Sequence, residues 1–328
     1  MVRAAVRWAC YDGRCRVLRA VAAIASPRNG DCRLKQQLGT GFFQIAALAC
    51  LASTLAGCGI ATAPVIDPKG PITLIQRDLI FTALGMMMIV VVPVFVMAFW
   101  FAWRYRASGG KGRYTPDWSY SGAVDAVIWL VPAGIIIVLG YLLWTTTHKL
   151  DPYRQLAGSE AALEVEVVAQ DWKWLFIYPQ YGIASVNELA FPSSRPLSLK
   201  ITSDTVMNSF MIPALGGQIY AMAGMTTRLH LLADAPGQFA GRNTQYSGDG
   251  FADQHFVAEA MTDDSFATWV DTVRRSQRSL DAAAYAELAE PSIAHGVTYY
   301  SGFEPGLFDT ILAKYAARPH HSDAMAAE

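Results

Sequence analysis

Cysteine is missing from most of this chain. All five cysteines lie at or before Cys58, so disulfide bonds and thiolate metal sites are excluded from everything that follows that residue. An excess of positive charge is missing too, because the formal net charge at pH 7 is −1. Proteins that bind nucleic acid usually carry a basic surface, so we expect no nucleic-acid partner. Low-complexity tracts and internal repeats are also absent.

Two long stretches of the chain carry no charged side chain. They cover residues 79–103 and 126–147, and each matches the roughly 20 apolar residues that a helix needs to cross a hydrocarbon layer about 30 Å thick. Two buried helices of a soluble domain are the alternative, but uninterrupted runs of this length are rare in soluble cores. The pattern predicts a transmembrane helical hairpin over residues 79–147. The turn between the runs is typical of a cytoplasmic loop, with the cations Arg104, Arg106, Lys111 and Arg113.

The overall composition leaves room for a second, more polar part. The mean hydropathy is +0.24 and 53% of the residues are hydrophobic. These values are too polar for a protein that lies entirely in the membrane and too apolar for an ordinary soluble one. One membrane hairpin joined to one globular domain fits both values.

Residues 1–57 contain an export signal. Arg33 and Lys35 give a positive start, residues 41–55 are apolar, and small residues precede Cys58, which is the order of a secretory signal. The tetrapeptide Leu-Ala-Gly-Cys that ends at Cys58 resembles the lipobox of bacterial lipoproteins, in which the cysteine is lipidated and becomes the new N-terminus. A plain signal with an incidental cysteine is the alternative. The Arg-rich residues 1–31 match nothing, which an upstream start codon or an additional targeting segment would explain.

Export of Cys58 would fix the orientation of the hairpin. Residues 58–78 would then be periplasmic, the first helix would run inward and the second would return outward. Everything after residue 150 would be periplasmic as well. A lipid chain on Cys58 would hold the N-terminus at the outer face of the inner membrane. We therefore expect a multi-pass inner-membrane protein with a lipid anchor.

Asp125 stands at the cytoplasmic start of the second apolar run. Ionisable groups at membrane depth are costly and often mark proton or ion paths, which makes Asp125 a candidate for proton entry. A carboxylate at a helix N-terminus is also stabilised by the helix dipole without any further role. The position of Asp125 alone leaves both interpretations open.

Short strands are expected in residues 148–261. Apolar and polar side chains alternate in residues 163–167 and 197–201, and residues 172–178 form an aromatic run. Alternation with a period of two indicates half-buried strands, and clusters of glycine, proline and serine separate them. Many short strands at near-regular spacing predict an all-β sandwich or barrel. Further strands are expected at residues 227–232 and 255–260.

The hydrophobic period changes again in residues 262–328. Thr262 or Asp263 can cap a helix. Two more helices are expected over residues 281–288 and 305–315, and the end from residue 318 reads as a flexible tail. The sequence therefore predicts a helical, aromatic-rich C-terminal region. The first helix would bury Phe266, Trp269, Val270 and Val273 on one face.

Three specific motifs lie in the β-rich part. Residues 170–179 read QDWKWLFIYP, residues 206–213 read VMNSFMIP and are followed by QIYAMAGM, and residues 246–251 read YSGDGF. Together with the lipobox and the hairpin, these motifs resemble subunit II of the haem–copper terminal oxidases over most of the chain. The resemblance implies a membrane α-helical hairpin and an all-β periplasmic domain, a cupredoxin-like Greek-key β-sandwich with a helical C-terminal extension.

One branch of this family, the cytochrome c oxidases, holds a dinuclear copper centre in the sandwich. Two cysteines, two histidines, a methionine and a backbone carbonyl bind it, and soft sulfur ligands suit such copper. His255 lies one position from the second histidine and would point to the opposite face of its strand. The resemblance therefore implies a sandwich without its metal. It places Asn208 and Gln254 at the histidines, Tyr246 and Gly250 at the cysteines, Gly248 at the carbonyl position and Val257 at the methionine.

A sandwich without copper resembles the quinol oxidase branch, the cytochrome bo-type ubiquinol oxidases. The resemblance implies a structural subunit, with no redox centre of its own, of a proton-pumping quinol:O₂ oxidoreductase. Haems and the remaining copper would lie in subunit I, subunits III and IV would complete the complex, and ubiquinol would be the substrate. Asp125, Trp129 and Pro132 match the family's proton entrance into subunit I, although the acid there is usually glutamate, which is one methylene longer.

Two other functions are weighed against this one. The first is a membrane-anchored lipoprotein whose metal-free cupredoxin-like domain binds or assembles another molecule. The second is a copper-bearing cytochrome c oxidase subunit, which the missing thiols oppose. Co-purification of haem and a large polytopic partner would separate an oxidase subunit from the free lipoprotein.

Overall fold

The computed structural model describes residues 63–106, 120–156 and 161–316. The predicted signal, with Cys58, lies outside these residues, as do Lys111 and Arg113 of the predicted cytoplasmic turn. The tail from residue 318 lies outside them too. Lipidation of Cys58 and the flexibility of the tail therefore stay predictions.

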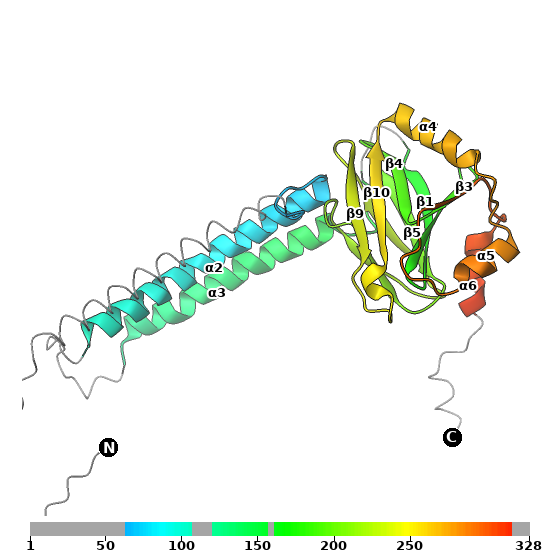
Figure 1. The fold of residues 1–328 in the computed structure, drawn as a ribbon. Coiled ribbons are helices and arrows are strands. Elements are labelled where there is room, and N and C mark those ends of the chain that lie inside the picture. Colours follow the sequence, from blue (N-terminus) through cyan, green and yellow to red (C-terminus); the bar gives the residue numbers. More distant parts are fainter. Residues whose placement is uncertain (1–62, 107–119, 157–160, 317–328) are drawn as a thin grey trace, which may run out of the picture. The chain divides into compact units, whose positions relative to one another are not determined.

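Two long helices form the first part of the described chain (Figure 1). They are α2 (Pro71–Arg104) and α3 (Gly122–Lys149), which lie side by side. Both are long and apolar enough to cross a membrane, and their most apolar stretches are not buried within the chain. Exposed apolar surface of this extent requires lipid or another protein as its neighbour. The helices match the predicted hairpin in number and position.

Helix α2 begins earlier than the hydrophobic pattern predicts. Its first residue is Pro71, whereas the apolar run begins at residue 79. Proline is favoured at the first position of a helix because its fixed backbone angle is already helical and its missing N–H is not needed there. Thr73 in the first turn is buried and donates a hydrogen bond from Oγ1 to the carbonyl oxygen of Ala214 at 3.1 Å. The end of the predicted periplasmic segment, residues 58–78, is therefore helical.

The second part is a sandwich of two β-sheets, the cupredoxin-like fold that the motifs imply. The six-stranded sheet has the order β11-β3-β2-β1-β5-β8, and the five-stranded sheet has the order β4-β10-β9-β6-β7. The pairs β1·β5 and β4·β10 are parallel and the other pairs are antiparallel. The strands are β1 (Leu163–Gln170), β2 (Lys173–Tyr178), β3 (Ile183–Val186), β4 (Glu188–Pro192), β5 (Leu197–Ser203), β6 (Asn208–Met211), β7 (Gln218–Ala221), β8 (Thr227–Leu231), β9 (Gly237–Asn243), β10 (His255–Met261) and β11 (Thr298–Tyr300).

Aromatic rings fill the space between the two sheets. The rings of Phe210 and Phe256 stack at 4.9 Å between centroids, and the edge of Trp174 meets Phe210 at 5.2 Å. Phe176 lies 5.2 Å from Phe256. Alternation places these residues on the inner faces of β2, β6 and β10, as expected for strands with one face in the core. This aromatic cluster joins both sheets, and three of its four rings come from the motifs at residues 170–179 and 206–213.

The C-terminal region forms three helices, as predicted, and one strand that the sequence did not indicate. The helices are α4 (Asp263–Arg274), α5 (Ala282–Ala289) and α6 (Leu307–Ala316). Thr262 caps α4, and the four apolar residues predicted for its inner face are buried. The strand β11 extends the six-stranded sheet by pairing with β3. Helices α5 and α6 pack on the outer face of this sheet and form a second apolar core with β1, β2 and β3.

Replacement of Phe256 by alanine tests whether the aromatic cluster holds the two sheets together. We expect Phe256→Ala to lower the free energy of unfolding by about 3–5 kcal/mol, because a large cavity would replace the ring. Val257 is the matched control, since it follows Phe256 on β10 and is 40% exposed; Val257→Ala should change stability by about 0.5 kcal/mol or less. Denaturant unfolding of the full chain in detergent measures both values. Equal losses for the two variants would contradict the prediction.

Candidate functional site

The two positions that the family pattern assigns to histidine lie together in the fold. Asn208 begins β6, and Gln254 directly precedes β10. Asn243, at the end of β9, lies between them and donates from Nδ2 to Asn208 Oδ1 at 2.7 Å and to Gln254 Oε1 at 2.8 Å. All three side chains are buried. A hydrogen-bonded chain of carboxamides therefore occupies this position in the sandwich.

Neighbouring groups satisfy the rest of this amide network, which we define as Asn208, Asn243 and Gln254. The Oδ1 atom of Asn243 accepts hydrogen bonds from the backbone N–H groups of Ser209 at 2.8 Å and Gln245 at 3.0 Å. Asn208 Nδ2 donates to the carbonyl oxygen of Val206 at 2.9 Å. Buried polar groups are stable only when paired in this way, because an unpaired donor or acceptor keeps its full desolvation cost. Ser247 completes the network by donating from Oγ to Gln254 Oε1 at 3.1 Å.

Trp172 covers the loop that would carry the two cysteines. Its backbone adopts φ = 64°, a left-handed conformation that is unusual for a bulky residue. The indole Nε1 donates to the carbonyl oxygen of Ser247 at 3.1 Å. A Cβ atom at Gly250 would lie 2.4 Å from the Trp172 ring, and one at Gly248 would lie 3.4 Å from it. Any side chain at Gly250, including that of cysteine, would require the ring to move.

The remaining sequence-predicted positions lie outside the amide network. Tyr246 is 71% exposed and contacts Phe251 at 5.7 Å between ring centroids. Val257 is exposed on the outer face of β10 and lines a groove rather than meeting Gln254. His255 is exposed while Gln254 is fully buried, so the two side chains point to opposite faces, as predicted.

The side chains present do not fit a dinuclear copper centre. Such a centre needs thiolates that bridge the metals, and the sequence has no cysteine beyond Cys58. The two histidine positions carry neutral carboxamides that already bind each other through Asn243. Within residues 63–106, 120–156 and 161–316, no group of three or more His, Cys, Asp and Glu side chains is placed to hold a metal ion.

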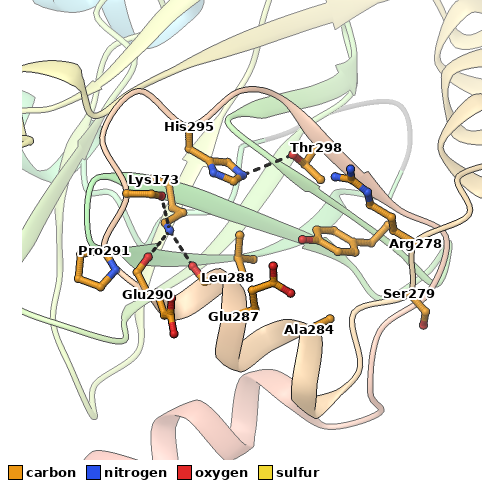
Figure 2. A pocket seen from close by; sticks show the side chains of 12 residues that line it. Lys173, Arg278, Ser279, Ala284, Glu287, Leu288, Glu290, Pro291, His295 and Thr298 are labelled. Atoms are coloured by element: carbon orange, nitrogen blue, oxygen red, sulfur yellow. Dashed lines mark hydrogen bonds between the residues drawn. The ribbon is translucent and has the colours of Figure 1, made fainter.

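A second polar site lies between β2 and the C-terminal region (Figure 2). Lys173 is 1% exposed, and its Nζ donates to the carbonyl oxygens of Leu288 and Glu290, both at 2.7 Å, and to Ser292 Oγ at 2.6 Å. Burial lowers the pKa of Lys173 below its ordinary value, and the charges of Asp171 and Glu290 partly offset this shift. Burial and the cation of Lys173 also lower the pKa of His295 across a cavity of about 570 Å³. Sequence reasoning treated Lys173 only as part of an aromatic strand.

Asp125 lies in the first turn of α3, one turn before Trp129. Its backbone N–H donates to the carbonyl oxygen of Ser121 at 2.9 Å, which is the first hydrogen bond of the helix. The predicted position of Asp125 at the start of the second span is therefore correct. Its role in proton entry stays a prediction.

Comparison with known proteins identifies the class to which this fold and site belong. The COX Aromatic Rich Motif family matches residues 274–318, which we call the aromatic-rich segment. Cytochrome bo(3) ubiquinol oxidase subunit 2 of Pseudomonas putida is 48% identical over 82% of this chain and 86% of its own length. Ubiquinol oxidase subunit 2 of Acetobacter aceti is 48% identical over 83% of this chain and 89% of its own length.

A solved structure is also similar to the sandwich. The periplasmic domain of subunit II of cytochrome oxidase from Bradyrhizobium japonicum is 25% identical, with a TM-score of 0.33, over 35% of this chain and 96% of that domain. Sequence identity of 48% over more than four fifths of this chain shows its family membership. The chain belongs to the family of cytochrome bo(3) ubiquinol oxidase subunit 2.

Removal of the central amide tests the network. Asn243→Ala would leave Asn208 Oδ1 and the buried backbone N–H of Ser209 without the partner that Asn243 supplies, at a cost of about 1–3 kcal/mol for each. Asp249→Ala is the control, because Asp249 is exposed in the following loop and should contribute about 0.5 kcal/mol or less. Thermal unfolding of the full chain measures the difference. A cost for Asn243→Ala no larger than that of the control would mean that the network does not stabilise the fold.

Proposed function

We propose that this chain is the second subunit of a proton-pumping quinol:O₂ oxidoreductase and performs no redox step itself. The amide network carries this proposal, because a domain built like a copper relay has buried carboxamides at the two imidazole positions and no cysteine at the thiolate positions. An oxidase that draws electrons from a membrane quinol needs no such relay from a soluble donor. The names of the relatives, ubiquinol oxidase subunit 2, support the same function.

The redox cofactors would lie in another subunit of the complex. We propose that haems and copper are held by subunit I, that subunits III and IV complete the assembly, and that ubiquinol is the substrate of the whole. The exposed apolar surfaces of α2 and α3 support contact with a polytopic partner, since apolar helix surface in a membrane packs against lipid or other helices. The chain would scaffold the complex and cover the periplasmic face of subunit I.

The proposed location is the bacterial inner membrane, with the sandwich in the periplasm. Two apolar helices support a hairpin that enters and leaves on the same side. A lipid on Cys58 would add an anchor at the outer face of the membrane, because one acyl chain reinforces other membrane contacts. The export signal predicted within residues 1–57 would give this orientation.

Purification of the tagged full chain in mild detergent tests the proposed function. We expect haem absorbance, a larger polytopic subunit and oxygen uptake that depends on added quinol but not on reduced soluble cytochrome c. A preparation with no haem and no polytopic partner would favour the free lipoprotein instead. Oxygen uptake driven by soluble cytochrome c through this chain would contradict the proposal that it lacks a redox role.

Substitution of Asp125 tests its proposed part in proton entry. Asp125→Asn keeps the size of the side chain but removes its titratable proton, so quinol-driven oxygen uptake should slow several-fold while the amount of assembled complex stays constant. Asp151→Asn is the control, because Asp151 follows the opposite end of α3. Equal rates of oxygen uptake and proton pumping in the two variants would leave Asp125 only its favourable interaction with the helix dipole.

A further inference from the structure

The aromatic-rich segment contacts the sandwich through a buried cation of the sandwich. Lys173 of β2 uses all three of its donors on the stretch from Leu288 to Ser292. Figure 2 shows the ammonium group of Lys173 directed at the carbonyl groups of Leu288 and Glu290, next to Pro291. Hydrogen bonds from a charged group are stronger than those between neutral groups. This contact therefore fixes the C-terminal end of α5 to the start of β2.

A buried anion of the sandwich makes the second contact with the same segment. Asp204 follows β5 and is 3% exposed. Its Oδ1 lies 2.7 Å from Nζ of Lys314, and its Oδ2 accepts a hydrogen bond of 2.7 Å from the hydroxyl of Tyr285. The hydroxyl of Tyr315 also donates to the backbone carbonyl of Asp204. The hydrogen bond to Asp204 is the main cause that raises the pKa of Lys314.

Lys173 and Asp204 both lie near residues at the positions that the family pattern assigns to copper ligands. Lys173 directly follows Trp172, whose ring covers Gly248 and Gly250. Asp204 lies in the loop that leads to Asn208 of the amide network. Across this loop, Oγ of Ser203 at the end of β5 donates to the carbonyl oxygen of Val206 at 2.6 Å, and Nδ2 of Asn208 at the start of β6 donates to the same oxygen. The backbone N–H of Asp204 donates to the carbonyl oxygen of Ala169 at 2.9 Å, and the same oxygen accepts from Ser203 Oγ at 3.4 Å. Hydrogen bonds through Asp204, Ala169 and Ser203 therefore connect Lys314 to the amide network.

We propose that the aromatic-rich segment braces the two loops that carry Trp172 and Asn208, with Lys173 and Asp204 as its positioning residues. A bound metal cross-links the segments that supply its ligands, and its binding energy becomes folding energy. Neutral amide hydrogen bonds contribute only about 0.5–1.5 kcal/mol each. In place of a metal between the sheets, the aromatic-rich segment holds these two parts of the chain in position from the outer face of the six-stranded sheet. This role is independent of the electron donor of the complex.

Hydrogen exchange on the purified full complex tests this role. Lys314 is half exposed, with a side-chain exposure of 53%, so Lys314→Met removes the charge opposite Asp204 without cutting into a core. We expect amide exchange in residues 203–209 to rise by about tenfold or more, the effect of losing one charged hydrogen bond. Exchange in β9 and β10 away from the network should stay unchanged. Lys314→Arg keeps a cation next to Asp204 and should retain the original rates.

Two further variants make the result decisive. Lys173→Met should raise amide exchange around Trp172, in residues 170–173 and 247–250. Residues 203–209 should exchange more slowly in this variant than in Lys314→Met. Lys200→Met is the control, because it removes only a half-exposed ion pair with Glu164 on the same sheet, and pairs of this kind contribute little. Local and separate increases would support the brace. Unchanged rates for Lys314→Met, or a uniform increase over the whole sandwich, would overturn it.

Discussion

The side-chain amide of Asn243 is the contact on which the described sandwich depends at the end that carries Asn208 and Gln254. It joins Asn208 to Gln254 at 2.7 and 2.8 Å and so connects β6, β9 and the residue before β10 through buried side chains. Each carboxamide of the amide network forms a hydrogen bond with its neighbour. Substitution of one member therefore leaves a buried group of another without its partner. In this network, carboxamides stand at the two positions where a copper centre would need imidazole ligands. The ring of Trp172 lies against Gly248 and Gly250 of the neighbouring loop.

The hairpin, the sandwich and the aromatic-rich segment complement one another. The hairpin presents apolar surface that only lipid or another membrane protein can cover. The sandwich keeps its shape through an aromatic core between the sheets and an amide network at one end. The aromatic-rich segment covers the outer face of the six-stranded sheet, adds β11 to it and binds two buried charges of opposite sign, Lys173 and Asp204. These features fit the scaffold role that we propose for the chain.

Much of this architecture follows from local sequence patterns, and the exceptions have physical causes. Alternation predicted β1 and β5, β8 and β10 were predicted as further strands, and helical spacing predicted the inner face of α4. The three-residue strand β11 was missed because so short a segment shows no period and forms only by pairing with β3. The positions of Asn208 and Gln254 were predicted from the family pattern, but Asn243 carries no motif. Its role, like that of Lys173, arises from contacts between segments far apart in the chain.

The central claim is that carboxamides have replaced copper ligands in this sandwich. Its most direct test is the copper content of the full chain, purified by itself from cells grown with added copper and examined by metal analysis and electron paramagnetic resonance. The account predicts no stoichiometric copper and no mixed-valence signal, because Asn208, Asn243 and Gln254 bind one another and no thiolate is present after Cys58. Copper bound in a fixed ratio to the chain, with the spectrum of a dinuclear centre, would contradict it.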